Sequence, residues 1–373
     1  MMLKIGLLAA DLTHHHGWAH YSTSVAQALI RAGVDVRIVT TRSSPLHPDL
    51  EAAHLLPNVD PFDRGMLLRQ LAALPAVRRA LADVDLVHCA VEVYAPLAHR
   101  IAGERPLVIT GHGTYVRLPL RRWAGRLYRR AFLAGTLACV SSYTAREAKR
   151  ILPALEPIVI PNGVDLARFE SLPRQPAPQP TILFVGAVKA RKGVLELVQS
   201  LPAVRAAIPE ARCVIIGSLD ADIEYVSRIR GEITRLALDD AVTLTGRVSE
   251  ADLLGWYAQA HVFALPAQTV DGKFEGYGLV ALEASAAGLP VIASRDCGAE
   301  DAVDHDLTGL LIDQRDQVSN LAAALIRILR DPSLAARMGT AGRAKAARTT
   351  WDHTAQALIA LYRARLAGGT RTR

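Results

Sequence analysis

The chain has 373 residues, half of them hydrophobic, and a formal net charge of +7. This length exceeds one hydrophobic core of usual size, so it predicts two domains, each with enough apolar residues for its own core. Four scattered cysteines exclude a tight zinc cluster or a disulfide framework. The sequence contains no run of about 18 uncharged apolar residues, the length needed to span a bilayer. We therefore expect a cytoplasmic protein without transmembrane segments.

Apolar runs alternate with helical patterns through the first half, a rhythm typical of parallel sheets with crossover helices. We predict a helix at residues 23–32 and strands at residues 3–10, 34–40, 86–90, 107–110, 137–141 and 158–160. A Pro-Asn-Gly turn at residues 161–163 leads into a proline-rich stretch. We place the first domain at residues 1–170 and an extended linker at residues 171–180.

The strand and helix rhythm restarts after the linker and predicts a second doubly wound domain at residues 181–350. Its strands are expected at residues 181–185, 213–216, 242–244, 261–265, 291–293 and 310–312. Ser249 and Asp252 resemble a capping pair at the start of a helix. The last helix, residues 351–373, is expected to pack back on the first domain.

Ligands of open α/β sheets bind outside the carboxyl ends of the strands, so the loops after strands hold the candidate site residues. His112 follows one strand between two glycines, where its imidazole could bind a substrate hydroxyl or could simply be satisfied at the strand end. In GAVKARKG, Lys189, Arg191 and Lys192 lie among glycines and could enclose a diphosphate. The alternative for this loop is a solvated basic turn, and it matches neither a Rossmann fingerprint nor a Walker loop.

Two glutamates eight residues apart, Glu275 and Glu283, flank the start of another predicted helix. Glu275 precedes the helix and Glu283 is expected about two turns into it, so the two carboxylates could hold two hydroxyl-rich groups. Gly276 and Gly278 allow close backbone approach, and the amides near residues 277–280 could bind an anion. A sugar, a ribose and the diphosphate between them suit this arrangement, and the alternative is an ordinary helix with one exposed and one capping glutamate.

The first half carries the excess positive charge, because residues 1–170 contain 20 basic and 14 acidic side chains. Residues 117–130 alone hold six arginines and no acid. Such a helix could lie on an anionic membrane or meet an anionic acceptor, and it could equally be an ordinary surface helix. Nucleic acid is not expected as a partner, since aromatic platforms are few. His14, His15, His16 and His20 invite a metal hypothesis, but no complete ligand shell is evident, so no metal is expected.

With these residues assembled, the chain resembles the retaining family 4 glycosyltransferases over nearly its whole length. Matching stretches are GHGTY, CVSSYTAREAKRIL, IPNGVDLARF, ARKG, LTGRVSEADLLGWYAQAHVFALPA, EGYGLVALEASAAGLPVIAS and GAEDAVDHDLTGLLI. The resemblance implies two Rossmann-like domains facing across a cleft, the GT-B arrangement, and a nucleoside-diphosphate sugar as donor without a metal or other cofactor.

The same resemblance implies roles for individual residues. His112, Lys192 and Glu275 would be catalytic, with Glu275 on the donor sugar and Lys192 on the leaving diphosphate. The implied donor-binding set is Gly186, Lys189, Arg191, Gly246, Arg247, Val248, Gly276, Tyr277, Gly278, Leu279 and Glu283, with Glu283 on the ribose. Gly17, Trp18, Arg121 and Arg122 are the candidates for the acceptor side.

Two positions depart from the family pattern. The arginine that normally follows the glycine of the diphosphate loop is Ala187, so Lys189 or Arg191 must supply the second cation. The glycine pair expected after the first strand is also altered, with Trp18 following Gly17.

The favoured hypothesis is a retaining glycosyltransferase that acts on a glycan or lipid-linked acceptor and that could make peripheral contact with the inner face of a membrane. The alternatives are a catalytically silent subunit of the same fold and a sugar-nucleotide epimerase.

Overall fold

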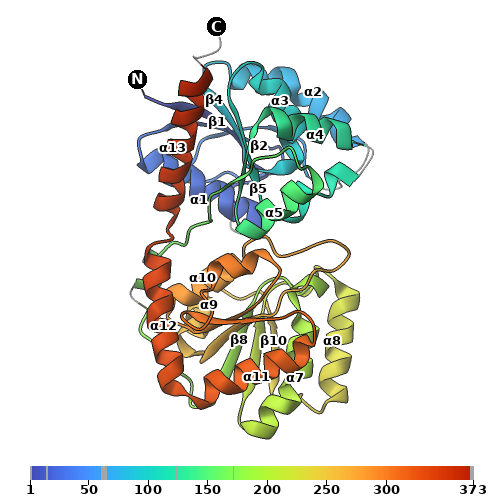
Figure 1. Ribbon diagram of the computed structural model, residues 1–373, viewed down its shortest axis with the longest axis vertical. Coiled ribbons are helices and arrows are strands. Elements are labelled where there is room, and N and C mark those ends of the chain that lie inside the picture. The colour runs from blue at the N-terminus through green and yellow to red at the C-terminus, as the bar shows by residue number, and fades with distance from the viewer. Residues whose placement is uncertain (1, 14–15, 60–64, 122–123, 171, 370–373) are drawn as a thin grey trace. The chain divides into compact units, whose positions relative to one another are not determined.

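The computed structural model describes residues 2–13, 16–59, 65–121, 124–170 and 172–369, which form two units built on parallel sheets (Figure 1). One unit comprises Met1–Gly163 with Trp351–Arg373, and the other comprises Val164–Thr350. The prediction of an α/β protein with two doubly wound parallel sheets is confirmed.

The sheet of the first unit has the strand order β3-β2-β1-β4-β5-β6-β7. Its strands are β1 (Lys4–Leu8), β2 (Asp35–Thr41), β3 (Ala52–Leu56), β4 (Leu86–Cys89), β5 (Leu107–Gly111), β6 (Thr136–Cys139) and β7 (Ile158–Val159). The order reverses between β1 and β4, which pair in parallel from Ile5 and Leu86 onward. The carboxyl ends of strands at such a reversal are the usual place for a ligand.

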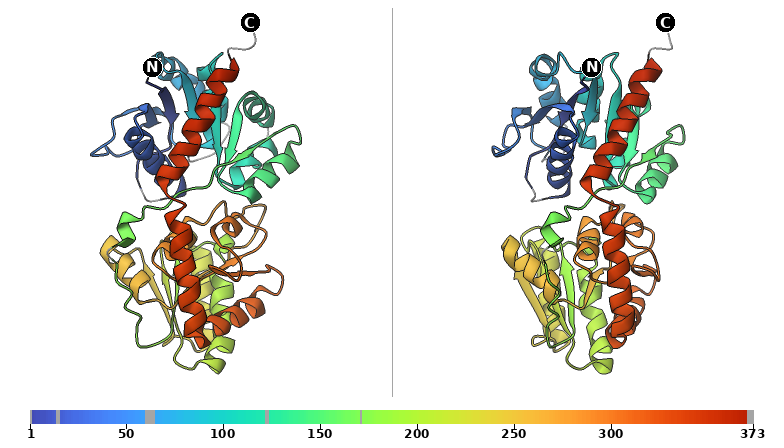
Figure 2. Two further views of the ribbon diagram at one scale, coloured as in Figure 1. Left: turned by 60° about the vertical axis from the view of Figure 1, so that its left-hand side comes forward. Right: turned by 90° about the vertical axis from the view of Figure 1, so that its left-hand side faces the viewer.

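Helices cover both faces of this first sheet. They are α1 (Gly17–Arg31), α2 (Gly65–Ala80), α3 (Ala95–Ala102), α4 (Gly125–Ala134), α5 (Ser142–Ile151) and α13 (Trp351–Gly369), with the short helices η1 (Glu92–Tyr94), η2 (Thr114–Val116) and η3 (Pro119–Arg121). The C-terminal helix α13 lies along α1, as two views show (Figures 1 and 2). A hydrogen bond of 2.7 Å joins Arg31 of α1 to Asp352 of α13.

The sheet of the second unit has the strand order β10-β9-β8-β11-β12-β13. Its strands are β8 (Thr181–Val185), β9 (Arg212–Ile216), β10 (Val242–Gly246), β11 (Val262–Leu265), β12 (Val291–Ser294) and β13 (Gly309–Ile312). Its helices are α6 (Ala167–Glu170), α7 (Val194–Ala207), α8 (Ile223–Arg235), α9 (Glu250–Gln259), α10 (Leu279–Ala286), α11 (Gln317–Arg330) and α12 (Pro332–Ala347), with η4 (Ala190–Lys192) and η5 (Gly298–Ala302). Helix α7 packs against α11, and α10 packs against α12.

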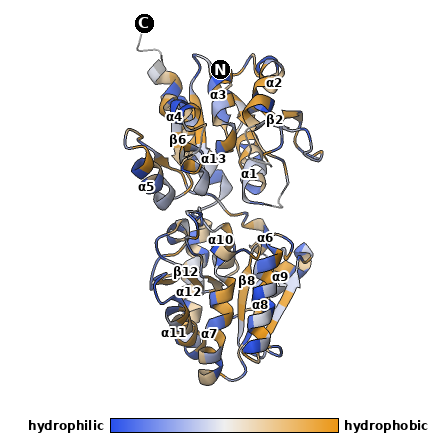
Figure 3. Ribbon diagram, turned by 90° about the vertical axis from the view of Figure 1, so that its right-hand side faces the viewer, coloured by the Kyte–Doolittle hydropathy of each residue, from blue (hydrophilic) through white to orange (hydrophobic). Residues whose placement is uncertain are grey.

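The strands owe their burial to continuous apolar sequence. All five residues of β8 are buried, and the four that follow Thr181 are hydrophobic (Figure 3). Parallel strands covered by helices on both faces have this pattern, whereas half-exposed strands alternate. The four cysteines are buried and form no disulfide bond. Within the described residues, no helix is both long enough and apolar enough to cross a membrane.

Two local expectations differ from the structure. Helix α1 begins at Gly17 rather than at residue 23, because the ring of His16 caps it by accepting the N–H of Ala19 at 3.3 Å. Residues 172–180, the described part of the stretch that we expected to be a linker, belong to the second unit. Its Arg174 donates to the carbonyls of Tyr257 and Ala260 at the end of α9, at 2.7 and 2.6 Å.

Candidate functional site

The three neighbouring strands β8, β9 and β10 each have a glycine at or directly after their last residue. Gly186, Gly217 and Gly246 have φ values of 148°, 144° and 72°. The Gly217 N–H donates to the Gly246 carbonyl at 2.9 Å, and a Cβ on Gly217 would lie 2.0 Å from the Gly186 oxygen. The positive φ values disfavour larger residues at all three positions, and Gly217 also lacks room for a Cβ, so the carboxyl ends of these strands present bare backbone that a ligand can approach closely.

A cluster of three charges lies where β8 passes into η4. The Oε2 atom of Glu275 is 2.6 Å from Lys192 Nζ and 2.6 Å from Arg191 Nη1. Lys192 and Glu275 are only 9% and 8% exposed. Burial raises the pKa of Glu275, but attraction to Lys192 and Arg191 outweighs it and lowers the pKa to about 2. The carboxylate is therefore ionised at every physiological pH.

This cluster bears on the missing arginine at Ala187. Arg191 extends to the same carboxylate oxygen as Lys192, whereas the Lys189 side chain is exposed. Of the two candidates for the second cation, the geometry favours Arg191. Gly193 ends η4 with φ 70°, and a Cβ there would lie 1.7 Å from the Pro266 oxygen, so the basic turn is pressed against the chain after β11.

Helix α10 holds Glu283 in a buried position. Leu279 is the first residue of the helix, and Gly278 directly before it has φ 79°. The two preceding residues, Gly276 and Tyr277, are buried. Glu283 is the fifth residue of the helix, closer to its start than the two turns expected, because the helix begins only at Leu279.

Both oxygens of Glu283 have protein partners. Its Oε1 accepts from Arg168 Nη1 at 3.0 Å, and its Oε2 accepts from the Tyr257 hydroxyl at 3.1 Å.

The remaining donor candidates lie in the loop after β10. The loop carries Arg247, which is exposed, and Val248, which is half-buried. Ser249 then caps α9 by accepting the Asp252 N–H at 3.1 Å, as the sequence predicts.

In the first unit, two bonds tie His112 to the segment after β4. Its N–H donates to a carboxyl oxygen of Glu92, and its Nε2 donates to the Ala90 carbonyl at 2.7 Å. Burial lowers the pKa of His112 to about 4, so the ring is neutral at pH 7. With the proton on Nε2, Nδ1 is the ring's acceptor, which suits a substrate hydroxyl.

The structure adds a buried polar chain that sequence reasoning missed. The Tyr362 hydroxyl meets His88 Nδ1 at 2.7 Å, His88 Nε2 meets the Thr110 hydroxyl at 2.7 Å, and Thr110 meets the Tyr21 hydroxyl at 2.9 Å. The Tyr21 ring lies edge-on to His112 with ring centroids 4.5 Å apart. These contacts connect helix α13 to His112 within the same unit.

The buried side chains of Glu92, His88 and His112 predict that the stability of the protein has a pH optimum. Burial lowers the pKa of His88 to about 3 and of His112 to about 4, so stability falls as the pH drops below 6.5, where the unfolded chain takes up protons first. Burial raises the pKa of Glu92 to about 8, so stability also falls as the pH rises from 4.5 to 8. The melting temperature should peak at about pH 6 to 7, where these opposing slopes cross.

Glu92→Gln keeps the acceptor for His112 but cannot ionise, so it should flatten the decline of melting temperature between about pH 7 and 8. An equal decline in both proteins would contradict a neutral Glu92.

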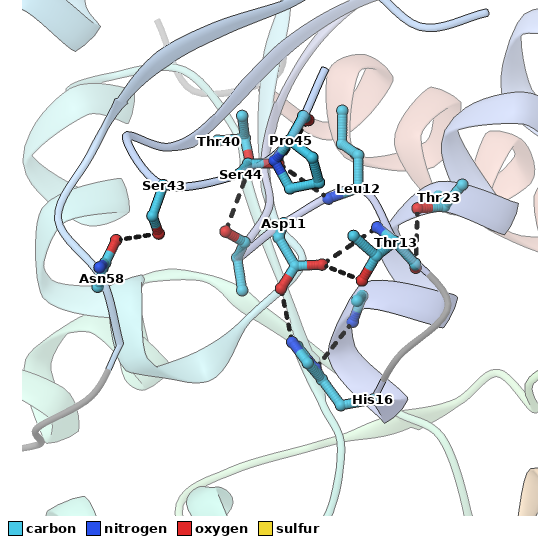
Figure 4. Close-up of polar contacts among 12 residues, drawn as sticks. Asp11, Leu12, Thr13, His16, Thr23, Thr40, Ser43, Ser44, Pro45 and Asn58 are labelled. Carbon is cyan, nitrogen blue, oxygen red and sulfur yellow. Dashed lines mark hydrogen bonds and ion pairs between the residues drawn. The ribbon is translucent and has the colours of Figure 1, made fainter. Parts of the chain in front are cut away.

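The loop after β1 is organised by Asp11 (Figure 4). Its Oδ1 accepts from the Thr13 hydroxyl at 2.7 Å, and its Oδ2 lies 2.6 Å from His16 Nε2. His14 and His15 lie outside the described residues. Gly17 is exposed at the start of α1, and Trp18 packs on Tyr115 with ring centroids 4.8 Å apart. Among the described residues, no group of three His, Cys, Asp or Glu side chains could hold a metal.

The basic segment at residues 117–130 is not one helix. Its described parts include η3 and the start of α4, and Arg117 is buried in an ion pair with Glu147, so this arginine cannot face a membrane. Arg121 ends η3, and Arg122 lies outside the described residues. Arg126, Arg129 and Arg130 of α4 are exposed.

Comparison with known proteins matches both units. The family described as Glycosyltransferase Family 4 matches residues 16–168, and the family described as Glycosyl transferases group 1 matches residues 169–345. A GDP-mannose-dependent alpha-(1-6)-phosphatidylinositol monomannoside mannosyltransferase of Mycobacterium tuberculosis is 35% identical, over 77% of this chain and 78% of the relative.

Two further matches extend over more of the chain. A D-inositol 3-phosphate glycosyltransferase of Pseudarthrobacter chlorophenolicus is 28% identical over 92% of this chain and 89% of its own. The solved structure of sucrose-phosphate synthase from Thermosynechococcus elongatus superposes with a TM-score of 0.79 and 26% identity, covering 98% of this chain and 100% of that one.

Proposed function

The chain belongs to family 4 of the glycosyltransferases, and from this premise we propose that it transfers mannose from GDP-mannose to an inositol-containing glycolipid with retention of anomeric configuration. The binding of a nucleoside-diphosphate donor in this proposal rests on the cluster of Lys192, Arg191 and Glu275, which lies beside the glycines at the carboxyl ends of the second sheet's strands. Names of relatives support the sugar and the acceptor, because one uses GDP-mannose and two act on molecules that contain inositol.

Lys192 and Arg191 would stabilise the negative charge that develops on the leaving diphosphate. The bond from the sugar C1 to the phosphate oxygen breaks, and the acceptor hydroxyl attacks C1 from the same face. A phosphate oxygen of the leaving group then takes the acceptor proton, so no covalent enzyme intermediate is required. His112 would accept a hydrogen bond from a sugar hydroxyl through Nδ1. No metal is part of this proposal.

The direct test incubates the protein with GDP-mannose and phosphatidylinositol monomannoside, without added metal, and identifies the products by mass spectrometry and NMR. An α-linked dimannosylated lipid is expected. An isomerised donor would support the epimerase alternative. Nucleotide binding without any product would support the silent subunit, which the altered position Ala187 motivates.

A lipid acceptor requires contact with a membrane, and α4 supplies a surface suited to it. Exposed Arg126, Arg129 and Arg130 lie on α4, close to a pocket of about 350 Å³. The pocket is lined mainly by leucines, and its lining residues come from α2, α3 and α4.

Changing these three arginines to glutamine should reduce binding to vesicles that contain anionic lipid by about 100-fold, because each charge contributes about 1 kcal/mol. Retained binding at equal ionic strength would identify α4 as an ordinary surface helix.

A further inference from the structure

Arg168 connects two carboxylates of the second unit. It lies in α6, and its Nη1 donates to Glu283 Oε1 at 3.0 Å. Its Nε and Nη2 reach Glu250 Oε1 at 2.8 and 2.7 Å. Glu250 opens α9 directly after the loop that carries Gly246. One planar guanidinium thus joins the start of α9, which follows the loop after β10, to the carboxylate of α10.

Tyr257 holds Glu283 from its other side. The Tyr257 hydroxyl donates to Glu283 Oε2 at 3.1 Å, and the ring is fully buried with its neighbour Phe169 edge-on, ring centroids 5.7 Å apart. An ionised carboxylate offers about four lone-pair sites, so two remain after these bonds, one on each oxygen. A carboxylate fixed in this way can accept both hydroxyls of a vicinal diol.

We propose that Arg168 and Tyr257 are positioning residues that set Glu283 to accept the 2′ and 3′ hydroxyls of the donor ribose together. The inference rests on the proposed function, because it takes the donor to be a nucleoside-diphosphate sugar. Arginine suits this task since its rigid fork can bond two carboxylates at once, whereas a lysine is a flexible point charge. Free rotation of Glu283 would leave one hydroxyl without an acceptor.

The experiment measures a diol factor, defined as the Kd of 2′,3′-dideoxy-GDP divided by the Kd of GDP, by calorimetry. Hydrogen bonds to a charged acceptor predict a diol factor of about 10 to 100 for the wild type. Arg168→Met should lower it to about 3 or less, and Tyr257→Phe, which keeps the ring packing, should give an intermediate value. Where GDP does not bind, UDP and its dideoxy form replace it.

The matched control is Arg174→Met, because Arg174 also anchors α9 but bonds only to backbone carbonyls there. It should lower the melting temperature and leave the diol factor unchanged, which separates positioning from general destabilisation.

Three outcomes would overturn the inference. If Arg168→Met and Tyr257→Phe both keep the diol factor of the wild type, the two residues do not position Glu283, and the proposed function stays intact. A wild-type diol factor near one would remove Glu283 from the ribose as well. Failure of the wild type to bind either nucleotide would overturn the proposed function and the inference with it.

Discussion

Replacing Lys192 by alanine is expected to lower turnover by about 100- to 1000-fold, because a fixed charge aimed at a developing anion is worth about 3 to 4 kcal/mol. Lys192 is only 9% exposed and enters the site from η4, so water cannot readily take its place. The loss should appear in kcat, measured with saturating donor, since the charge on the leaving group grows only as its bond breaks.

Lys345→Ala is the control for this variant. Lys345 also pairs with a carboxylate of the second unit, Asp304 at 2.7 Å, but lies on α12 outside the candidate site. It should keep wild-type turnover. Unchanged turnover in a folded Lys192→Ala protein would remove this residue from the mechanism and give the leaving group to Arg191.

The sequence predicts the sheets well because their strands are buried on both faces and read as continuous apolar runs. It does not reveal β3, whose residues are mostly half-buried at the sheet edge, or α2, which contains Pro75. Neither segment shows a clear period of hydrophobic residues. The early start of α1 depends on a histidine cap, a rare choice beside serine or aspartate, so no local signal marks it.

The candidate site could be identified residue by residue but not as a network. Lys192 and Glu275 stand out by their motifs, yet their ion pair joins positions far apart in the chain, and only the folded sheet brings them together. Arg168 lies in the matching stretch IPNGVDLARF, but that stretch carries no signal of the two carboxylates that its side chain contacts. Glu92 offered a weak sequence signal, because an acid shortly after a buried strand lies at the carboxyl end of the sheet, where ligands bind.

Glu275→Gln should separate turnover from nucleotide binding. The ionised carboxylate lies against the two cations that would receive the diphosphate, so it competes with that ligand for them. Its neutral isostere removes a like charge from the phosphate site, and GDP should bind about 3- to 10-fold more tightly. Turnover should nevertheless fall by about 100-fold or more, because the charge expected beside the donor sugar in the transition state is lost.

Glu232→Gln provides the same substitution in an ion-paired glutamate of α8, outside the site, and should change neither quantity. Calorimetry with GDP and initial rates with GDP-mannose measure the two effects in parallel. Weaker GDP binding in Glu275→Gln would show that the carboxylate instead orders Lys192 and Arg191 for the phosphates. Tighter binding with slower transfer would identify an interaction that favours the transition state over the bound nucleotide, because binding and turnover then change in opposite directions.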